Sequence, residues 1–242
     1  DVLKPKSMKK MILSAVMLVL AASGYAQETG AAGAGERNEW LPTFEAVAVD
    51  ADLDVKFVRV PDTEAPKIVY DTKGSYTTKF RAEVKDKTLR ISEKPDSRRP
   101  DRTEVTVYYN ALRAVSLSGA AATFEGTLAA AVLDVTVNRK ASLTAKLDVK
   151  DLKMEQTGYS TANLSGSVRY LSLYVSTGKV AASDLEVMSA EVNAQSKAEV
   201  SLWITDRFVG KTTTNARISY KGDPKIVRGG AKFMGGEINR VE

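Results

Sequence analysis

The chain has 242 residues, of which 43% are hydrophobic and 27% charged, an ordinary balance for a globular protein rather than a disordered one. It contains neither cysteine nor histidine, which excludes disulfides, thiolate nucleophiles, serine–histidine–aspartate triads and the usual zinc sites. Residues 1–26 carry four lysines and one aspartate, so the remainder has 31 basic and 29 acidic side chains. Because this balance is close to neutral, we expect no nucleic-acid partner.

Residues 1–26 have the layout of a short upstream extension followed by a cleavable secretory signal. Met8-Lys9-Lys10 is a basic start, Met11 to Ala22 is a short apolar run, and small residues precede Gln27. The apolar run is shorter than the roughly 20 residues that a membrane-spanning helix needs. We therefore expect an exported protein (periplasmic, on the outer surface or secreted) with no transmembrane segment once the signal is removed.

The next two regions differ in their patterning. Residues 27–39 are rich in glycine and alanine without an apolar period, which predicts a flexible leader. Residues 40–131 predict an irregular β region, continuous with the repeats that follow, in which Asp86-Lys87 forms a tight turn. Its expected strands are Phe44 to Val49, Asp54 to Val60, Lys67 to Tyr70, Lys79 to Val84, Thr88 to Ser92, Glu104 to Tyr109 and Leu112 to Ser118.

From Leu133 onward the sequence resembles itself in successive 19-residue copies. Apolar residues recur at alternate positions, which is typical of half-buried strands, and each copy contains two such strands joined by polar corners. The first strands align Leu133, Leu152, Leu171, Ala190 and Val209, and the second strands align Leu143, Ala162, Ala181 and Val200. Each copy is too short to bury its own apolar face, but copies stacked in register bury a continuous core. The sequence therefore predicts an all-β fold, a parallel β-helix (solenoid) of 19-residue rungs over residues 132–242 with a polar, glycine-rich C-terminal cap.

The order of these pieces resembles a known family of secreted proteins. The resemblance rests on Phe44 to Val49, Asp54 to Phe57, Leu89 to Ile91, Glu104 to Val107, Leu112 to Gly119 and a terminal element at Ile218 to Pro224. The chain is similar to the putative auto-transporter adhesin (head domain) family over roughly residues 40 to 242. It departs from that family at Asn138-Arg139, Ser176-Thr177 and Ser196-Lys197, where Ser-Gly pairs are typical. The resemblance implies a parallel β-helix and a role in surface adhesion.

Candidate ligand-binding residues lie at outward positions of the predicted strands. The 19-residue spacing predicts that Trp203 lies beside Asp184, with Tyr220 diagonal to it one rung on. An exposed aromatic ring next to a carboxylate can hold a sugar by stacking and hydrogen bonds, although Trp203 packing against a loop or the cap is the alternative. Tyr174, with Glu155 and Asn193 on either side of it, is a second candidate of the same kind.

The sequence indicates no catalytic, cofactor-binding or metal-binding residues. In the column Asp148, Ser167 and Glu186 the two acids are separated by a rung, so they do not form an acid–base pair. We therefore expect a non-catalytic binding or adhesion module of the cell envelope, with a polysaccharide or protein ligand. Two alternatives remain open: a structural spacer of the envelope or matrix, and a polysaccharide lyase or hydrolase built on a β-helix.

Overall fold

The computed structural model describes residues 35–73, 79–96 and 101–241, and for residues 229–233 it describes the backbone alone. All regular structure within these ranges is β-strand, as the sequence predicts. The first eight strands are β1 (Glu36–Trp40), β2 (Ala46–Asp50), β3 (Asp54–Arg59), β4 (Lys67–Asp71), β5 (Phe80–Lys85), β6 (Thr88–Glu93), β7 (Glu104–Tyr109) and β8 (Ala114–Ser118). The other eight are β9 (Ala121–Asn138), β10 (Ser142–Thr157), β11 (Thr161–Ser176), β12 (Lys179–Gln195), β13 (Glu199–Thr213), β14 (Arg217–Lys221), β15 (Ile226–Phe233) and β16 (Glu237–Arg240). None of the residues described forms a helix with the length and apolarity needed to cross a bilayer.

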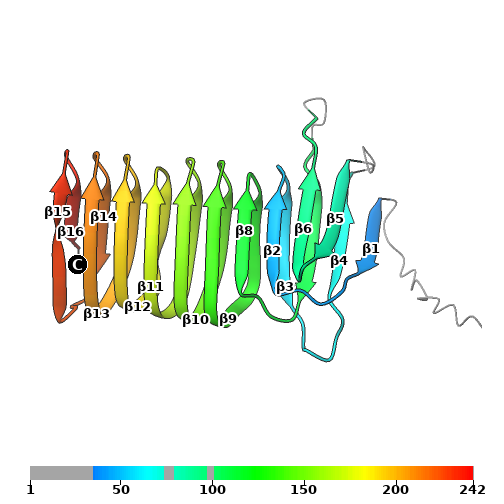
Figure 1. Ribbon diagram of the computed structural model, residues 1–242, viewed down its shortest axis with the longest axis horizontal. Helices are drawn as coiled ribbons and strands as arrows, with labels where there is room; N and C mark the ends of the chain where they lie inside the picture. The colour runs from blue at the N-terminus through cyan, green and yellow to red at the C-terminus, as the bar shows by residue number, and fades with distance from the viewer. Residues whose placement is uncertain (1–34, 74–78, 97–100, 242) are drawn as a thin grey trace, which may run out of the picture. The chain divides into compact units, whose positions relative to one another are not determined.

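The strands stack side by side along one axis and wind into a solenoid (Figure 1). The core of the solenoid lies between two facing sheets. The first sheet consists of β5, β6, β2 and β8, the C-terminal halves of β9 to β13, and β15. The second sheet consists of β1, β4, β7 and β3, the N-terminal halves of β9 to β13, then β14 and β16. The parallel solenoid predicted for the C-terminal region is confirmed, because β9 to β13 pair in parallel with their neighbours.

Each long strand belongs to both sheets because it bends at a polar corner. In β10 buried and exposed side chains alternate until Lys150 and Asp151, two consecutive exposed residues, after which the alternation resumes in the opposite phase. Side chains alternate sides along a strand, so this change of phase keeps both halves facing the same core. Arg169 and Tyr170 form the equivalent corner of β11.

The opposite edge of each rung closes with a tight turn. Pairs of consecutive residues have positive φ there, including Arg139 with Lys140 and Ser196 with Lys197. Two positive φ angles in succession define the turn whose twist matches that of the flanking strands. In the turn that contains Ser196 and Lys197, the closing hydrogen bond runs from the Ala198 amide to the Gln195 carbonyl at 3.1 Å. The predicted tight turn at Asp86-Lys87 is of the same kind and joins the antiparallel strands β5 and β6.

The N-terminal rungs are stacked out of chain order. The rung β2–β3 lies between the rung β6–β7 and the rung β8–β9, since β2 pairs with both β6 and β8 and β3 pairs with both β7 and β9. Residues 40–131 therefore continue both sheets of the solenoid. Beyond β6 and β7, the antiparallel strands β5, β4 and β1 close this end, where the rings of Tyr70 and Phe80 stack 4.3 Å apart.

The predicted column of the first strands holds for four rungs and that of the second strands for two, and each then shifts. Leu133, Leu152, Leu171 and Ala190 are in register as expected, but Phe208 rather than Val209 continues this column. In the second strands Val180 rather than Ala181 points inward. The prediction of a polar last rung was wrong in part, because the shift turns Lys211, Ser219 and Lys221 outward and leaves Phe208, Ile218 and Tyr220 buried.

Candidate binding face on the second sheet

The outer face of the second sheet carries a row of small polar side chains along the whole solenoid. Directly paired residues of neighbouring strands point to the same side of a sheet, so this row can be followed from the strand register. In spatial order it contains Asn38, Val69, Thr106, Lys56, Thr123, Thr144, Asn163, Ala181, Ser201, Ser219 and Asn239. Most of these residues can both donate and accept hydrogen bonds. The face is therefore able to hydrogen-bond a long polar ligand.

Trp203 stands on this face next to a lysine. Leu202 and Ile204 on either side of it point into the core, so the indole points outward, where it is half-buried. The paired residue on β14 is Lys221, whose Nζ lies 5.0 Å from the centre of the indole ring. Gly222 follows Lys221 with φ +101°, and a Cβ at that position would overlap the Ile204 carbonyl oxygen and come within 3.1 Å of Trp203 Cδ1. The indole is thus held across the edge of β14 with an ammonium group against it.

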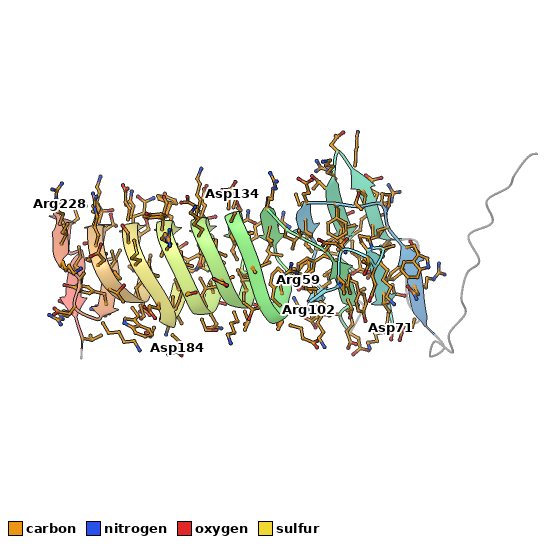
Figure 2. All side chains as sticks on the ribbon, turned by 90° about the horizontal axis from the view of Figure 1, so that it is seen from below. Arg59, Asp71, Arg102, Asp134, Asp184 and Arg228 are labelled. Atoms are coloured by element: carbon orange, nitrogen blue, oxygen red, sulfur yellow. The ribbon has the colours of Figure 1, made fainter. Side chains whose placement is uncertain are left out.

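The predicted pairing of Trp203 with Asp184 is wrong. The residue of β12 that pairs with Trp203 is Glu186, whereas Asp184 is in register with Ser165 of β11. The cause is a bulge, because three residues of β12 between Ala182 and Glu186 have no counterpart on β13. Asp184 does lie on the outer face of the second sheet: Figure 2 shows it on the same side of the ribbon as Asp71 and on the opposite side from Asp134.

The predicted outward place of Tyr220, diagonal to Trp203 one rung on, is also wrong. Tyr220 is only 8% exposed and lies in the core, with its ring centre 4.8 Å from that of Phe208. Its column is inward because Leu202, the residue paired with it, is inward. Tyr220 therefore stabilises the end of the solenoid and does not contribute to the surface around Trp203.

Tyr174 lies on the outer face of the first sheet, away from Trp203. Its predicted neighbours are confirmed, since Glu155 and Asn193 pair with it on either side. Its hydroxyl oxygen accepts a hydrogen bond from Nε2 of Gln195. This hydrogen bond fixes the ring of Tyr174. Because Tyr174 lies on the first sheet and Trp203 on the second, the two aromatic side chains do not share a surface.

A second aromatic group, which the sequence does not predict, lies on the same face as Trp203. Trp40 of β1 is 50% exposed and pairs with Lys67 of β4, which in turn pairs with Tyr108 of β7. Lys67 Nζ lies 5.5 Å from the indole centre and 4.7 Å from the phenol centre. Because the alternation of β7 turns Tyr109 into the core, Tyr108 could have been placed outside from sequence, but its partners depend on antiparallel strands that the repeat does not contain.

The lysines on this face differ in their electrostatic partners. Lys56 forms an ion pair with Glu125, and this hydrogen bond and charge raise the pKa of the Lys56 ammonium. Lys179 is paired with Glu199 at 4.0 Å. Lys67 and Lys221, the two lysines that lie over tryptophan rings, have no carboxylate partner within the described ranges of the chain. Their charge is available to a ligand.

A charged hollow lies at another place, on the edge of the solenoid that carries the tight turns. It is lined by six cationic and three acidic side chains: Lys79, Arg81, Lys94, Arg102, Arg139 and Lys140 with Asp50, Asp52 and Glu93. Several of these charges neutralise one another, since Arg139 contacts Asp50 at 3.2 Å and Arg102 contacts both Asp52 and Asp54. The part of the chain that the structure describes contains no group of three acidic side chains able to hold a metal ion.

The comparisons with known proteins agree with this architecture. The fold is similar to that of a crystallised putative adhesin from Bacteroides fragilis, with a TM-score of 0.77 and 18% identity over 85% of this chain and 96% of the other. A putative adhesin from Parabacteroides merdae gives a TM-score of 0.65 and 18% identity over 86% and 96% of the two chains. A putative lipid binding protein from Parabacteroides distasonis gives 0.59 and 17% identity over 86% and 98%. The comparison with curated proteins found no match.

A family profile matches most of the chain as well. The family is described as "Putative auto-transporter adhesin, head GIN domain", and the match covers residues 43–224. This range includes β2 to β14, and therefore all the rungs that pair in parallel through the middle of the solenoid. The resemblance inferred from the sequence is thereby confirmed, and the chain belongs to the auto-transporter adhesin head GIN domain family.

Proposed function

We propose that this protein is an exported, non-catalytic adhesion module that binds a polysaccharide on the outer face of its second sheet. The observation that carries the proposal is the place of Trp203, an outward indole with a lysine against it, in a flat face of hydroxyl and amide side chains. Sugars bind proteins by stacking their apolar face on aromatic rings while hydroxyl groups form hydrogen bonds with polar side chains. Membership of an adhesin family supports a binding role.

A binding role is also favoured over catalysis by the arrangement of acids on this face. Asp148, Ser167 and Glu186 occupy successive rungs, and the Ser167 hydroxyl donates to Asp148 at 3.4 Å. Two strand-to-strand steps separate the carboxylates, a distance of about 10 Å in a sheet with strands about 4.8 Å apart. Export is supported by the signal-like segment of residues 1–26, which lies outside the described residues.

The proposal is tested by retention on immobilised polysaccharides. The purified protein would be passed over a panel of bacterial-envelope and host polymers, and both retention and the release of new chain ends would be recorded. We expect retention without cleavage, and we expect Trp203→Ala to weaken it strongly. Tyr174→Ala is the matched control, because Tyr174 is an outward aromatic on the other sheet. Equal retention of the Trp203→Ala variant would overturn the proposed site, and release of chain ends would make the protein an enzyme.

A further inference from the structure

Both tryptophans of the chain lie on one face in matching surroundings. The sequence contains two tryptophans, and each stands at an outward position of the second sheet with a lysine as its directly paired neighbour. The pairs are Trp40 with Lys67 and Trp203 with Lys221, with Nζ to ring-centre distances of 5.5 and 5.0 Å. Because their strands are unrelated in the repeat, this recurrence is not a by-product of the 19-residue period.

The chemistry of each pair fits a carboxylated sugar. An indole face offers an apolar surface for the C–H groups of a pyranose ring, and an adjacent ammonium offers a charged hydrogen-bond donor for a carboxylate. Lys67 and Lys221 lack a carboxylate partner among the described residues, whereas Lys56 and Lys179 on the same sheet already have one. At the Lys67 site the ammonium is flanked by a second ring, that of Tyr108. The acidic group nearest to Trp203 along the row is its β12 partner Glu186, so the cation lies on one side of the indole only.

The spacing of the two pairs determines what kind of ligand can reach both. Eight strand-to-strand steps separate β1 from β13 along the second sheet, which corresponds to about 38 Å at about 4.8 Å per step. A trisaccharide reaches only one pair, whereas an extended polymer laid along the solenoid axis reaches both. Between them the polymer would cross the polar row, including Thr123, Thr144 and Asn163.

We propose that the Trp40–Lys67 and Trp203–Lys221 pairs are two subsites for one extended, carboxylated polysaccharide that runs along the second sheet. This inference rests on the proposed function, and it adds the charge of the ligand, its length and a second subsite at Trp40, Lys67 and Tyr108. Simultaneous contact makes the second binding event intramolecular, so a long polymer binds more tightly than a short oligomer of the same sugar.

The test compares polymer length, polymer charge and the two subsites. The probes are polygalacturonate, alginate and hyaluronan, with trigalacturonate as the short ligand and dextran as the neutral polymer, and binding is measured by isothermal titration calorimetry at low salt. We expect two trigalacturonate molecules per protein and no binding of dextran. We expect at least one of the three acidic polymers to bind about tenfold or more tightly than the trisaccharide.

The variants separate the second subsite from the first. Trp40→Ala and Trp203→Ala should each reduce trigalacturonate binding to one molecule per protein and remove the gain of the long polymer. Because Trp40→Ala also removes packing from the edge strand β1, Lys67→Met serves as a second variant that keeps both rings, and it should weaken acidic polymers in the same way. Tyr170→Ala, at a corner between the sheets, is the matched control and should bind like the unaltered protein.

The outcomes distinguish this inference from the proposed function. Loss of binding in Trp203→Ala with full binding in both Trp40→Ala and Lys67→Met overturns the second subsite and leaves the proposed function standing. Binding of dextran as tightly as the acidic polymers overturns the carboxylate requirement alone. If none of the polymers retains the protein or binds it in the calorimeter, both proposals are overturned.

Discussion

Gly166 of β11 lies directly beside Leu147 of β10, so close that a Cβ on Gly166 would overlap the carbonyl oxygen of Leu147. Gly166 also has φ +102°, a conformation that side chains with a Cβ rarely adopt. We expect Gly166→Ala to cost about 2–5 kcal/mol, from left-handed strain and overpacking together. Gly126→Ala is the matched control: its φ is +76° but nothing lies within 4 Å of the new Cβ, so we expect a loss of about 1–2 kcal/mol. Urea denaturation measures both, and equal losses would contradict the close approach at Leu147.

The phenol of Tyr70 predicts a loss of stability at alkaline pH. Burial, aided by a 2.6 Å hydrogen bond that the hydroxyl donates to Glu39, raises the pKa of Tyr70 from 10.0 to about 12. A phenol ionises more readily in the unfolded chain, so the stabilisation is complete below pH 10 and is lost as the pH rises through about 12. Urea titrations at pH 8, 10 and 11 should show a decline that is shallower in Tyr70→Phe. An identical decline in both proteins would contradict a raised pKa of Tyr70 in the folded protein.

Tyr109 is expected to behave differently when its hydroxyl is removed. It is 1% exposed between Phe57 and Phe124, and its hydroxyl is buried with no hydrogen-bond partner among the residues that the structure describes. An unsatisfied buried hydroxyl costs about 1–3 kcal/mol. Tyr109→Phe should therefore leave the free energy of unfolding unchanged or raise it by about 1 kcal/mol. Phe57→Ala, which removes a ring from the same cluster, should lower it by about 3–5 kcal/mol. A clear destabilisation by Tyr109→Phe would reveal a partner for the hydroxyl.

Gln156 connects two successive tight turns from inside the core. Its Nε2 donates to the carbonyl oxygens of Ser160 at 2.8 Å and Lys179 at 3.0 Å, and the side chain is fully buried. Gln156→Ala leaves these carbonyls without that donor and should cost about 1–3 kcal/mol. Gln195→Ala is the comparison, because that amide is half-buried and water can replace it. Protection of the Lys179 amide against hydrogen exchange should fall in the first variant and remain in the second.

The sequence predicts the elements better than their register. The alternation of apolar and polar residues places the strands of residues 44–118 within about two residues of their observed ends. It does so because a strand with one buried face needs apolar residues at every second position. The phase is lost at the turn after Ser176, which is one residue shorter than the turn after Thr157. The bulge of β12 between Ala182 and Glu186 compensates for it shortly afterwards. A comparison at a fixed spacing cannot detect a deletion that is followed so soon by an insertion, so it predicts Asp184 beside Trp203.

The candidate site is predictable only where it depends on one strand. The outward direction of Trp203 is predicted correctly, since it follows from the alternation of β13 alone. Its cationic neighbour Lys221 lies one position earlier in the chain than the residue that the 19-residue spacing pairs with Trp203. The fixed spacing therefore assigns Lys221 to an inward column. The group around Trp40 depends on β1 and β4, whose antiparallel pairing has no counterpart in the repeat. Contacts between strands of different origin require the three-dimensional register.

The out-of-order rung has a consequence for how the chain acquires its structure. Ala46 pairs with Thr88 and with Ala114, so two long loops must close before this rung is complete. From β10 to β13, by contrast, each strand pairs with the next one in the chain. Closing long loops slows folding, and sequentially stacked repeats can nucleate locally and propagate. We therefore expect the C-terminal rungs to form the folding nucleus. Strand β2 would then be among the last strands to be fixed in place, and it would stay exposed to proteases until β8 pairs with it.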